Sequence, residues 1–183
     1  IFLTVTRCFS VEIEGFGYEL NDNKTAVVIY SPPGITDIVM NSTVEYAGEN
    51  YTIYKIGADS FSSSSITTIT FPEKLTHISE NAFTHSKLRG ELVFPLSLEV
   101  ISNFAFSSTK ITSFNFPPSL RIIGSGAFLY CVDLSMDLNV RYVKSIGSHA
   151  FSSTGITGIS NLLCEEIQDF AFHSCVHLKE ANI

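Results

Sequence analysis

The sequence predicts a β-rich solenoid of short stacked repeats, preceded by a cap of β-hairpins. The first observation is a frame, apolar-x-x-apolar-x-Phe-Pro-x-x-Leu-x-x-Ile-x-x-x-Ala-Phe, that fills Ile111–Phe128 and recurs at Ile66–Phe83. The second is that residues 18–54 lack this frame and contain two turn sequences instead. A unit this short cannot bury its own apolar side chains, so the copies must stack on one another.

The repeat is anchored on a phenylalanine that recurs every 21 to 23 residues. An isoleucine stands five residues before each ring, and a small residue stands directly before it. The six rings are Phe61, Phe83, Phe106, Phe128, Phe151 and Phe172. This agreement predicts about five to six repeats over residues 55–183. Residues 178–183 begin another strand that nothing polar closes, so we expect an uncapped C-terminal end.

These positions resemble the BspA-like (Treponema-type) leucine-rich repeat family, whose pattern is Leu-x-x-Ile-x-Ile-Pro-x-x-Val-x-x-Ile-Gly-x-x-Ala-Phe-x-x-Cys. The resemblance covers about residues 18–183, with Phe often replacing the Ile before Pro. Arg141 and Asn161 stand where Pro is usual. The resemblance implies a leucine-rich-repeat solenoid.

Elementary reasoning leads to the same architecture for the repeats. The Ile-x-x-Ile-x-Phe segment alternates and stops at Pro72, Pro95 or Pro117, which indicates a short strand. Successive copies should pair in parallel, about 4.8 Å apart, into one continuous sheet on one face. The Leu-x-x-Ile segment predicts a second, shorter strand on the other face, and Ala-Phe predicts a turn or a single helical turn there.

The N-terminal part has a different organisation. Residues 18–54 predict capping hairpins, the first followed by the Pro32-Pro33-Gly34 turn and the second built around Ala47–Asn50. For residues 1–17 two interpretations stay open, the tail of a secretory signal peptide or the start of the cap.

Composition and motifs exclude several classes of function. The net charge is −7 with no basic run, so we expect no nucleic-acid partner. Purely apolar runs are far shorter than the roughly 18 residues that span a membrane, so no membrane span is predicted. The sequence has no G-x-S-x-G, H-E-x-x-H or P-loop motif. We therefore predict no catalytic residues and no enzymatic activity.

The cysteines and histidines suggest no metal and no cofactor. Cys131 and Cys175 hold the same repeat position two repeats apart, which puts them roughly 10 Å from each other, too far for a disulfide. We expect buried thiols at both positions. His173-Ser-Cys175-Val-His177 is the one metal-like cluster, but the repeat already accounts for Cys175 and no fourth ligand is evident.

A partner would meet the strand positions that cannot point inward. They are Thr68, Thr70, Glu91, Val93, Ser113, Asn115, Asp137, Asn139, Gly158, Ser160, Glu180 and Asn182. These residues are small, neutral or acidic, and they include no ring and no positive charge, so a solvated face and a recognition face are both open interpretations. Phe104 and Phe170, on the back of the repeat, are the alternative location for a site.

The resemblance implies a secreted or cell-surface module for adhesion and protein binding, because BspA-like proteins include surface proteins that bind host or matrix proteins and other cells. We expect a protein ligand of this class to bind the sheet face. The alternative is a structural spacer or scaffold for another region beyond residue 183.

Overall fold

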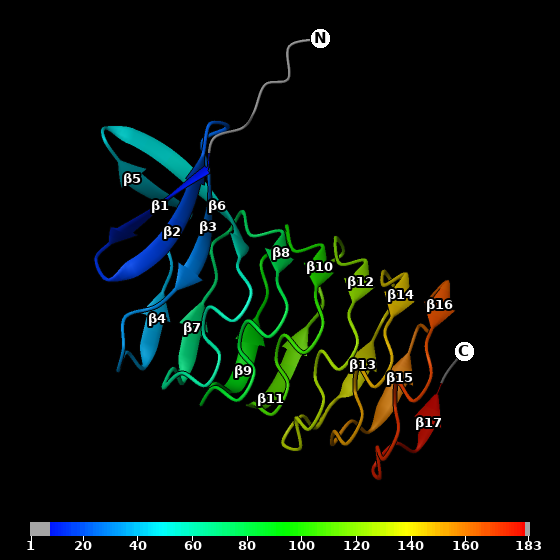
Figure 1. Cartoon of the computed structure of the whole chain (residues 1–183). Coiled ribbons are helices and arrows are strands. Elements are labelled where there is room, and N and C mark those ends of the chain that lie inside the picture. Colours follow the sequence, from blue (N-terminus) through cyan, green and yellow to red (C-terminus); the bar gives the residue numbers. More distant parts are fainter. Residues whose placement is uncertain (1–7, 182–183) are drawn as a thin grey trace.

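The structure, a computed structural model, describes residues 8–181 and shows a cap followed by a stack of repeats (Figure 1). The chain coils away from the cap, and each coil places one strand on each of two opposite faces. This is the predicted solenoid. Among the described residues no segment is helical, and the predicted helical turns are tight hydrogen-bonded turns.

The cap is built mainly from hairpins. Its six strands are β1 (Cys8–Ile13), β2 (Phe16–Asn21), β3 (Thr25–Tyr30), β4 (Asp37–Val39), β5 (Thr43–Tyr46) and β6 (Glu49–Ile56). Antiparallel pairing joins β1 to β2, β2 to β3 and β5 to β6. The turn pairs Glu14-Gly15 and Ala47-Gly48 are left-handed, which is the geometry that closes a two-residue hairpin. Residues 8–13, for which two interpretations were open, form β1.

One continuous sheet runs from the cap through all the repeats. It follows the order β1-β2-β3-β6-β8-β10-β12-β14-β16, with β5 paired to β6 at the side. Its repeat strands are β8 (His77–Ile78), β10 (Val100–Ile101), β12 (Ile122–Ile123), β14 (Ser145–Ile146) and β16 (Glu166–Ile167). Since β6 pairs in parallel with both β3 and β8, the cap covers the first edge of the repeat sheet.

The opposite face differs from the sequence prediction, because its strands form three small sheets rather than one continuous sheet. They group as β4–β7, β9–β11 and β13–β15–β17. The repeat strands are β7 (Thr68–Thr70), β9 (Arg89–Val93), β11 (Lys110–Asn115), β13 (Asp137–Asn139), β15 (Gly158–Ser160) and β17 (Glu180–Ala181).

The two breaks fall where the connecting segment changes length. The middle of β7, Ile69, follows Phe61 by eight residues, whereas Leu92 of β9 follows Phe83 by nine. Leu138 of β13 follows Phe128 by ten residues, against eight in the preceding repeat. A change of length does not by itself break the pairing, because β13 and β15 pair in regular register although Ile159 follows Phe151 by only eight residues. Even the pair β9–β11 contains an irregularity between Ile111 and Ser113.

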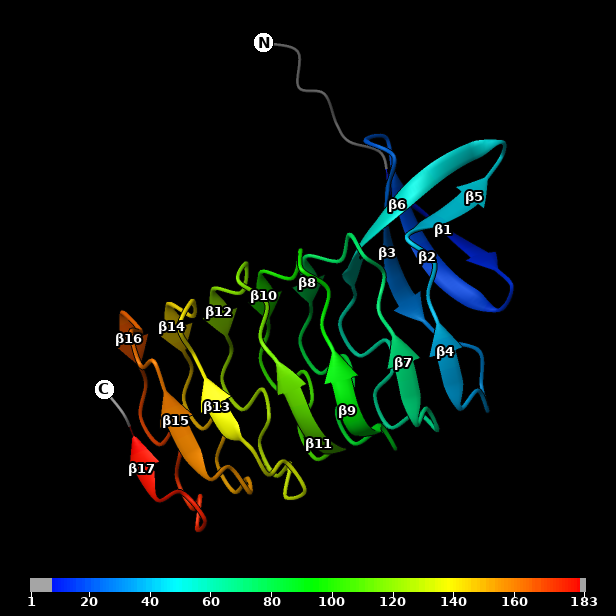
Figure 2. The same cartoon turned by 180° about the vertical axis from the view of Figure 1, so that it is seen from behind.

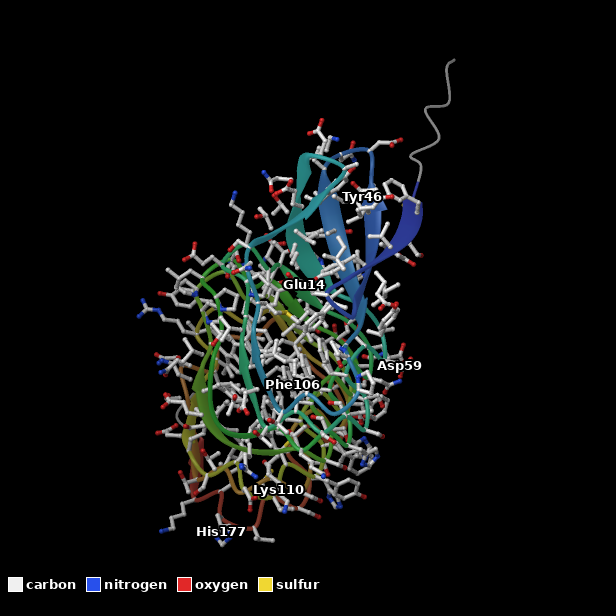
Figure 3. All side chains as sticks on the ribbon, turned by 90° about the vertical axis from the view of Figure 1, so that its left-hand side faces the viewer. Glu14, Tyr46, Asp59, Phe106, Lys110 and His177 are labelled. Atoms are coloured by element: carbon white, nitrogen blue, oxygen red, sulfur yellow. The ribbon has the colours of Figure 1, made fainter. Side chains whose placement is uncertain are left out.

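The core is a column of stacked rings between the two faces. Phe83, Phe106, Phe128 and Phe151 are fully buried, and consecutive ring centroids lie 5.1 to 5.4 Å apart with nearly parallel planes. This spacing is close to the distance between neighbouring strands, so one ring per repeat fills the interior without a gap. Figure 3, which looks along the stack from the cap, shows Phe106 inside the coil, with Asp59 and Lys110 at its periphery.

The segment around each ring is a turn with two left-handed residues. The first lies two residues before the ring, at Asp59, Asn81, Phe104, Gly126, His149 and Phe170; the second lies two residues after it, at Ser63, His85, Ser108, Tyr130, Ser153 and Ser174. We call the surface formed by these segments the turn face. Its backbone is paired between repeats: the amide of each ring residue from Phe61 to Phe151 donates to the next repeat, as from Phe83 N to Ala105 O and from Phe106 N to Ala127 O, each at 2.8 Å.

Candidate interaction surface

The structure places the predicted site residues together on the face that carries β7, β9, β11, β13, β15 and β17 (Figure 2). Each strand from β7 to β15 contributes two of them, and the residue between the two turns inward, as Leu92, Phe114 and Leu138 do. The predicted residues from Thr68 to Ser160 are exposed or half-buried. Glu180 lies on β17, and Asn182 lies outside the described residues.

Strand register aligns these residues into two rows within each small sheet. Ser113 lies opposite Glu91, and Asn115 lies opposite Val93. Further along, Asp137 lies opposite Gly158, and Asn139 lies opposite Ser160. A Cβ at position 158 would lie 3.2 to 3.3 Å from the Asp137 carboxylate, so glycine leaves that carboxylate room on the surface. We call this surface, with the β4 residues described next, the sheet face.

Two further residues of the sheet face escaped the sequence analysis. The short strand β4 of the cap pairs in parallel with β7, and it sets Asp37 opposite Thr68 and Val39 opposite Thr70. The signal was present in Ile35-x-x-Ile38-x-Met40, which repeats the apolar spacing of Ile66-x-x-Ile69-x-Phe71. The sheet face therefore begins inside the cap.

Three threonine hydroxyls donate hydrogen bonds to the Asp37 carboxylate on this face. Its side chain accepts hydrogen bonds from the hydroxyls of Thr68 at 2.6 Å, Thr36 at 2.7 Å and Thr67 at 3.4 Å. These hydrogen bonds, led by the one from Thr68, hold the pKa of the Asp37 carboxyl below its ordinary value, and the charge of Arg89 adds to the effect. The cap end of the sheet face thus carries a fixed negative charge.

The sheet face also has charged and apolar borders that sequence reasoning missed. Arg89 and Lys110 begin β9 and β11, where they lie opposite each other and are exposed, so positive charge does border the face. At the other end of β9, Val93 is 76% exposed. Leu96, which follows the strand, is 79% exposed. With Phe116 they line a shallow depression of about 180 Å³. Exposed apolar groups of this kind are the usual anchors of protein interfaces.

The metal-like residues do not form a site in the described part of the chain. Among residues 8–181, no three His, Cys, Asp or Glu side chains gather around a point where an ion could bind. Cys175 is buried and its thiol donates to the Phe151 carbonyl at 3.0 Å, while His173 packs against the ring of Phe170. The same residues include no helix long and apolar enough to cross a membrane.

The prediction of buried free thiols is confirmed. Cys131 and Cys175 are buried and unbridged, three residues after their rings. The Cys131 thiol donates to the Phe106 carbonyl at 3.1 Å and lies 3.4 Å from the Thr109 hydroxyl, which has the equivalent position in the preceding repeat. Burial is the main cause that raises the pKa of this thiol to about 11, although Thr109 opposes the shift.

Cys131 should make the protein less stable in alkali. The pKa of the thiol rises from 9.0 to about 11 on folding, so the folded state favours the protonated form. Its contribution is complete below pH 9 and is lost as the pH rises toward 11. We expect a loss of about 2 kcal/mol in unfolding free energy between pH 8 and pH 10.5 from this group.

Urea denaturation at the two pH values measures this loss. The control is Cys131→Thr, which copies Thr109 and Thr154 at the same repeat position. The free energy of unfolding of wild type, minus that of the variant, should be lower at pH 10.5 than at pH 8. Parallel pH profiles for the two proteins would contradict the assignment.

Comparisons with known proteins agree with this geometry. The family model described as the BspA type leucine rich repeat region matches six copies across residues 54–179, more than half of the chain. A search of curated proteins finds no match.

Solved structures share the fold at low sequence identity. A leucine-rich repeat protein from Bacteroides ovatus aligns with 18% identity and a TM-score of 0.70, covering 96% of this chain and 53% of its own. The leucine rich repeat protein of T. pallidum aligns with 22% identity and a TM-score of 0.70, covering 93% and 91%. A leucine rich cell surface protein from Faecalibacterium prausnitzii aligns with 20% identity and a TM-score of 0.69, covering 94% and 54%.

The present chain thus spans about half the length of two of these three proteins. Their identity to it is low enough that they establish the fold alone. Membership follows from the family match together with the repeat geometry: the chain belongs to the BspA-type leucine-rich repeat family.

Proposed function

We propose that the chain is a protein-binding module of a secreted or cell-surface protein and that it binds its partner through the sheet face. The observation that carries the proposal is the alignment of outward residues on six strands, from Asp37 on β4 to Ser160 on β15. Extended faces of this kind are the surfaces that solenoid proteins use for binding. The cell-surface description of the Faecalibacterium prausnitzii protein supports the location.

The chemistry of the sheet face favours a partner with basic and apolar groups. Its carboxylates at Asp37, Glu91 and Asp137 attract positive charge, and the exposed Val93 and Leu96 offer apolar contact. Single contacts between such exposed groups are weak. Binding strength would therefore come from many contacts spread over successive repeats. A host or matrix protein with an extended basic surface meets these requirements.

Charge reversal on the sheet face tests the proposal. The Glu91→Lys, Asp137→Lys double variant should weaken binding to an immobilised panel of matrix proteins about tenfold, which corresponds to about 1.4 kcal/mol. The control is Glu73→Lys, Glu99→Lys, which makes the same change of charge at exposed positions outside the strands of the sheet face. Equal binding by both variants in surface plasmon resonance would show that the partner binds elsewhere.

A second candidate is a spacer that carries another functional region. The observation that favours it is the length comparison, since the chain covers 53% of the Bacteroides ovatus protein. A spacer makes no specific contact through its repeats. Under this alternative the isolated chain binds none of the matrix proteins, and both double variants behave like wild type.

A further inference from the structure

A shallow groove of about 380 Å³ runs along the turn face, on a different surface from the sheet face. Its walls are formed by residues at the two left-handed positions of successive repeats, and its floor by the residues between them. Residues that line it include Asn81, His85, Phe104, Ser107, Ser108 and Tyr130. We call it the turn-face groove.

Two aromatic residues of the turn-face groove have an unfavourable backbone conformation. Phe104 has φ of 54° and Tyr130 has φ of 59°. This left-handed region is disfavoured for bulky side chains and is tolerated by glycine, asparagine and aspartate. In other repeats the position of Phe104 is held by Asp59, Asn81 and Gly126, which suit this conformation, and by His149 and Phe170. The position of Tyr130 is held by serine in four repeats and by His85 in one. The fold thus imposes this backbone conformation in every repeat, and Phe104 and Tyr130 present large rings from it.

Burial does not explain these rings either. The Tyr130 side chain is 57% exposed and that of Phe104 is 37% exposed, so neither belongs to the core. The Phe104 ring lies against the next repeat, because a Cβ at Gly126 would come within 2.4 to 2.5 Å of its atoms. That contact fixes the orientation of the ring in the groove wall. Exposed aromatic groups with a fixed orientation are a mark of binding sites.

The remaining groups of the groove are mostly polar and uncharged. The Ser107 hydroxyl donates to the Leu129 carbonyl at 3.2 Å, which leaves its oxygen free to accept. The Asn81 amide and the Ser108 hydroxyl add further donors and acceptors, and Asp59 is the only carboxylate among the lining residues. Protein hot spots are rich in Trp, Tyr and Arg and poor in Ser and Thr, whereas this lining has no Trp or Arg and includes Thr84, Ser107 and Ser108. Ligands that combine hydroxyl groups with apolar C–H faces fit this lining better.

We propose that the turn-face groove binds a neutral oligosaccharide. Pyranose rings stack with their C–H faces on Phe104 and Tyr130, and their hydroxyls exchange hydrogen bonds with Asn81, His85 and Ser108. The open shape of the groove suits an extended sugar chain that lies across several repeats. This site is additional to the protein-binding surface proposed above.

An array of defined neutral and acidic oligosaccharides tests the proposal with the whole chain. We expect binding to neutral members, and the strongest of them then serves as the ligand in calorimetric titrations. Tyr130→Asn should weaken its binding at least tenfold while leaving the melting temperature unchanged or raised, because asparagine accepts the left-handed conformation. Phe104→Asn should weaken binding similarly. Tyr130→Phe should retain it.

The matched control is Tyr142→Asn. Tyr142 is 47% exposed and lies outside the turn-face groove and the left-handed positions, so its loss should not change affinity. The Glu91→Lys, Asp137→Lys variant should also keep full affinity, which separates this proposal from the sheet-face proposal. Absence of any neutral ligand on the array, or equal binding by wild type and Tyr130→Asn, would overturn the inference. A chain that binds no sugar but binds a protein, with that protein binding lost in Tyr130→Asn, would likewise overturn the inference and assign the groove to a protein.

Discussion

Replacing Phe128 by alanine is expected to lower the free energy of unfolding by about 3–5 kcal/mol. Phe128 is fully buried, and its ring stacks on Phe106 at 5.4 Å and on Phe151 at 5.1 Å between centroids. It also contacts Phe114 at 4.8 Å. The backbone of the neighbouring repeats is tied by hydrogen bonds on both sides, so the cavity cannot collapse and the lost contacts are not replaced.

Guanidinium denaturation followed by circular dichroism measures this loss. The matched control is Phe172→Ala, because Phe172 is only half-buried and, among residues 8–181, its ring stacks on one other ring, that of Phe151. That variant should lose about 1–2 kcal/mol. Hydrogen exchange should quicken in the repeats that adjoin Phe128, since each repeat contacts its neighbours. A Phe128→Ala variant no less stable than Phe172→Ala would refute the ring column as the main source of stability.

Replacing Gly147 by alanine should cost about 3 kcal/mol through a different mechanism. A Cβ at this position would lie 2.4 Å from Ser125 N and 2.6 Å from Gly124 C, both backbone atoms of the preceding repeat. Backbone cannot rotate away as a side chain can, so the two repeats must separate. The separation would stretch the 2.8 Å hydrogen bond from Gly147 N to Ile123 O.

Ser102→Ala is the control, because residue 102 has the same repeat position and already carries a Cβ. Its unfolding free energy should stay within about 0.5 kcal/mol of wild type. Thermal unfolding followed by calorimetry compares the two variants. Equal melting temperatures for Gly147→Ala and wild type would show that the backbone at Gly124 and Ser125 leaves room for a Cβ at position 147.

The ring column and the repeat period could be predicted from sequence because they depend on local pattern alone. Phe106 and Phe128 are each followed by a ring 22 or 23 residues later, and stacking is the one arrangement that buries all of them. The outward strand residues followed from the same pattern, since neighbours of an inward residue such as Phe114 must point outward. Whether those outward residues bind a partner remains a prediction.

Other features depend on geometry that the pattern does not contain. The breaks between the three sheets of the sheet face coincide with changes of one or two residues in the connecting segments, but a similar change leaves β13 and β15 paired, so the sequence does not show which strands pair. The left-handed backbone at Phe104 and Tyr130 had no signal either, because aromatic residues are not expected there. At equivalent positions Asp59, Asn81 and Gly126 are the residues that indicated it. The turn-face groove could therefore be found only in the structure.

The hydrogen bonds of the turn face have an electrical consequence. Amides from Phe61, Phe83 and Phe106 all donate toward the next repeat, so their N–H bonds point in the same direction along the stack. Each peptide group has a dipole of about 3.5 D, and aligned dipoles add as they do in an α-helix. The turn face thus behaves as a macrodipole, negative at the cap, where Asp59 adds its carboxylate, and positive toward Asp169. A charged group bound along this surface would gain or lose energy according to which end it approaches.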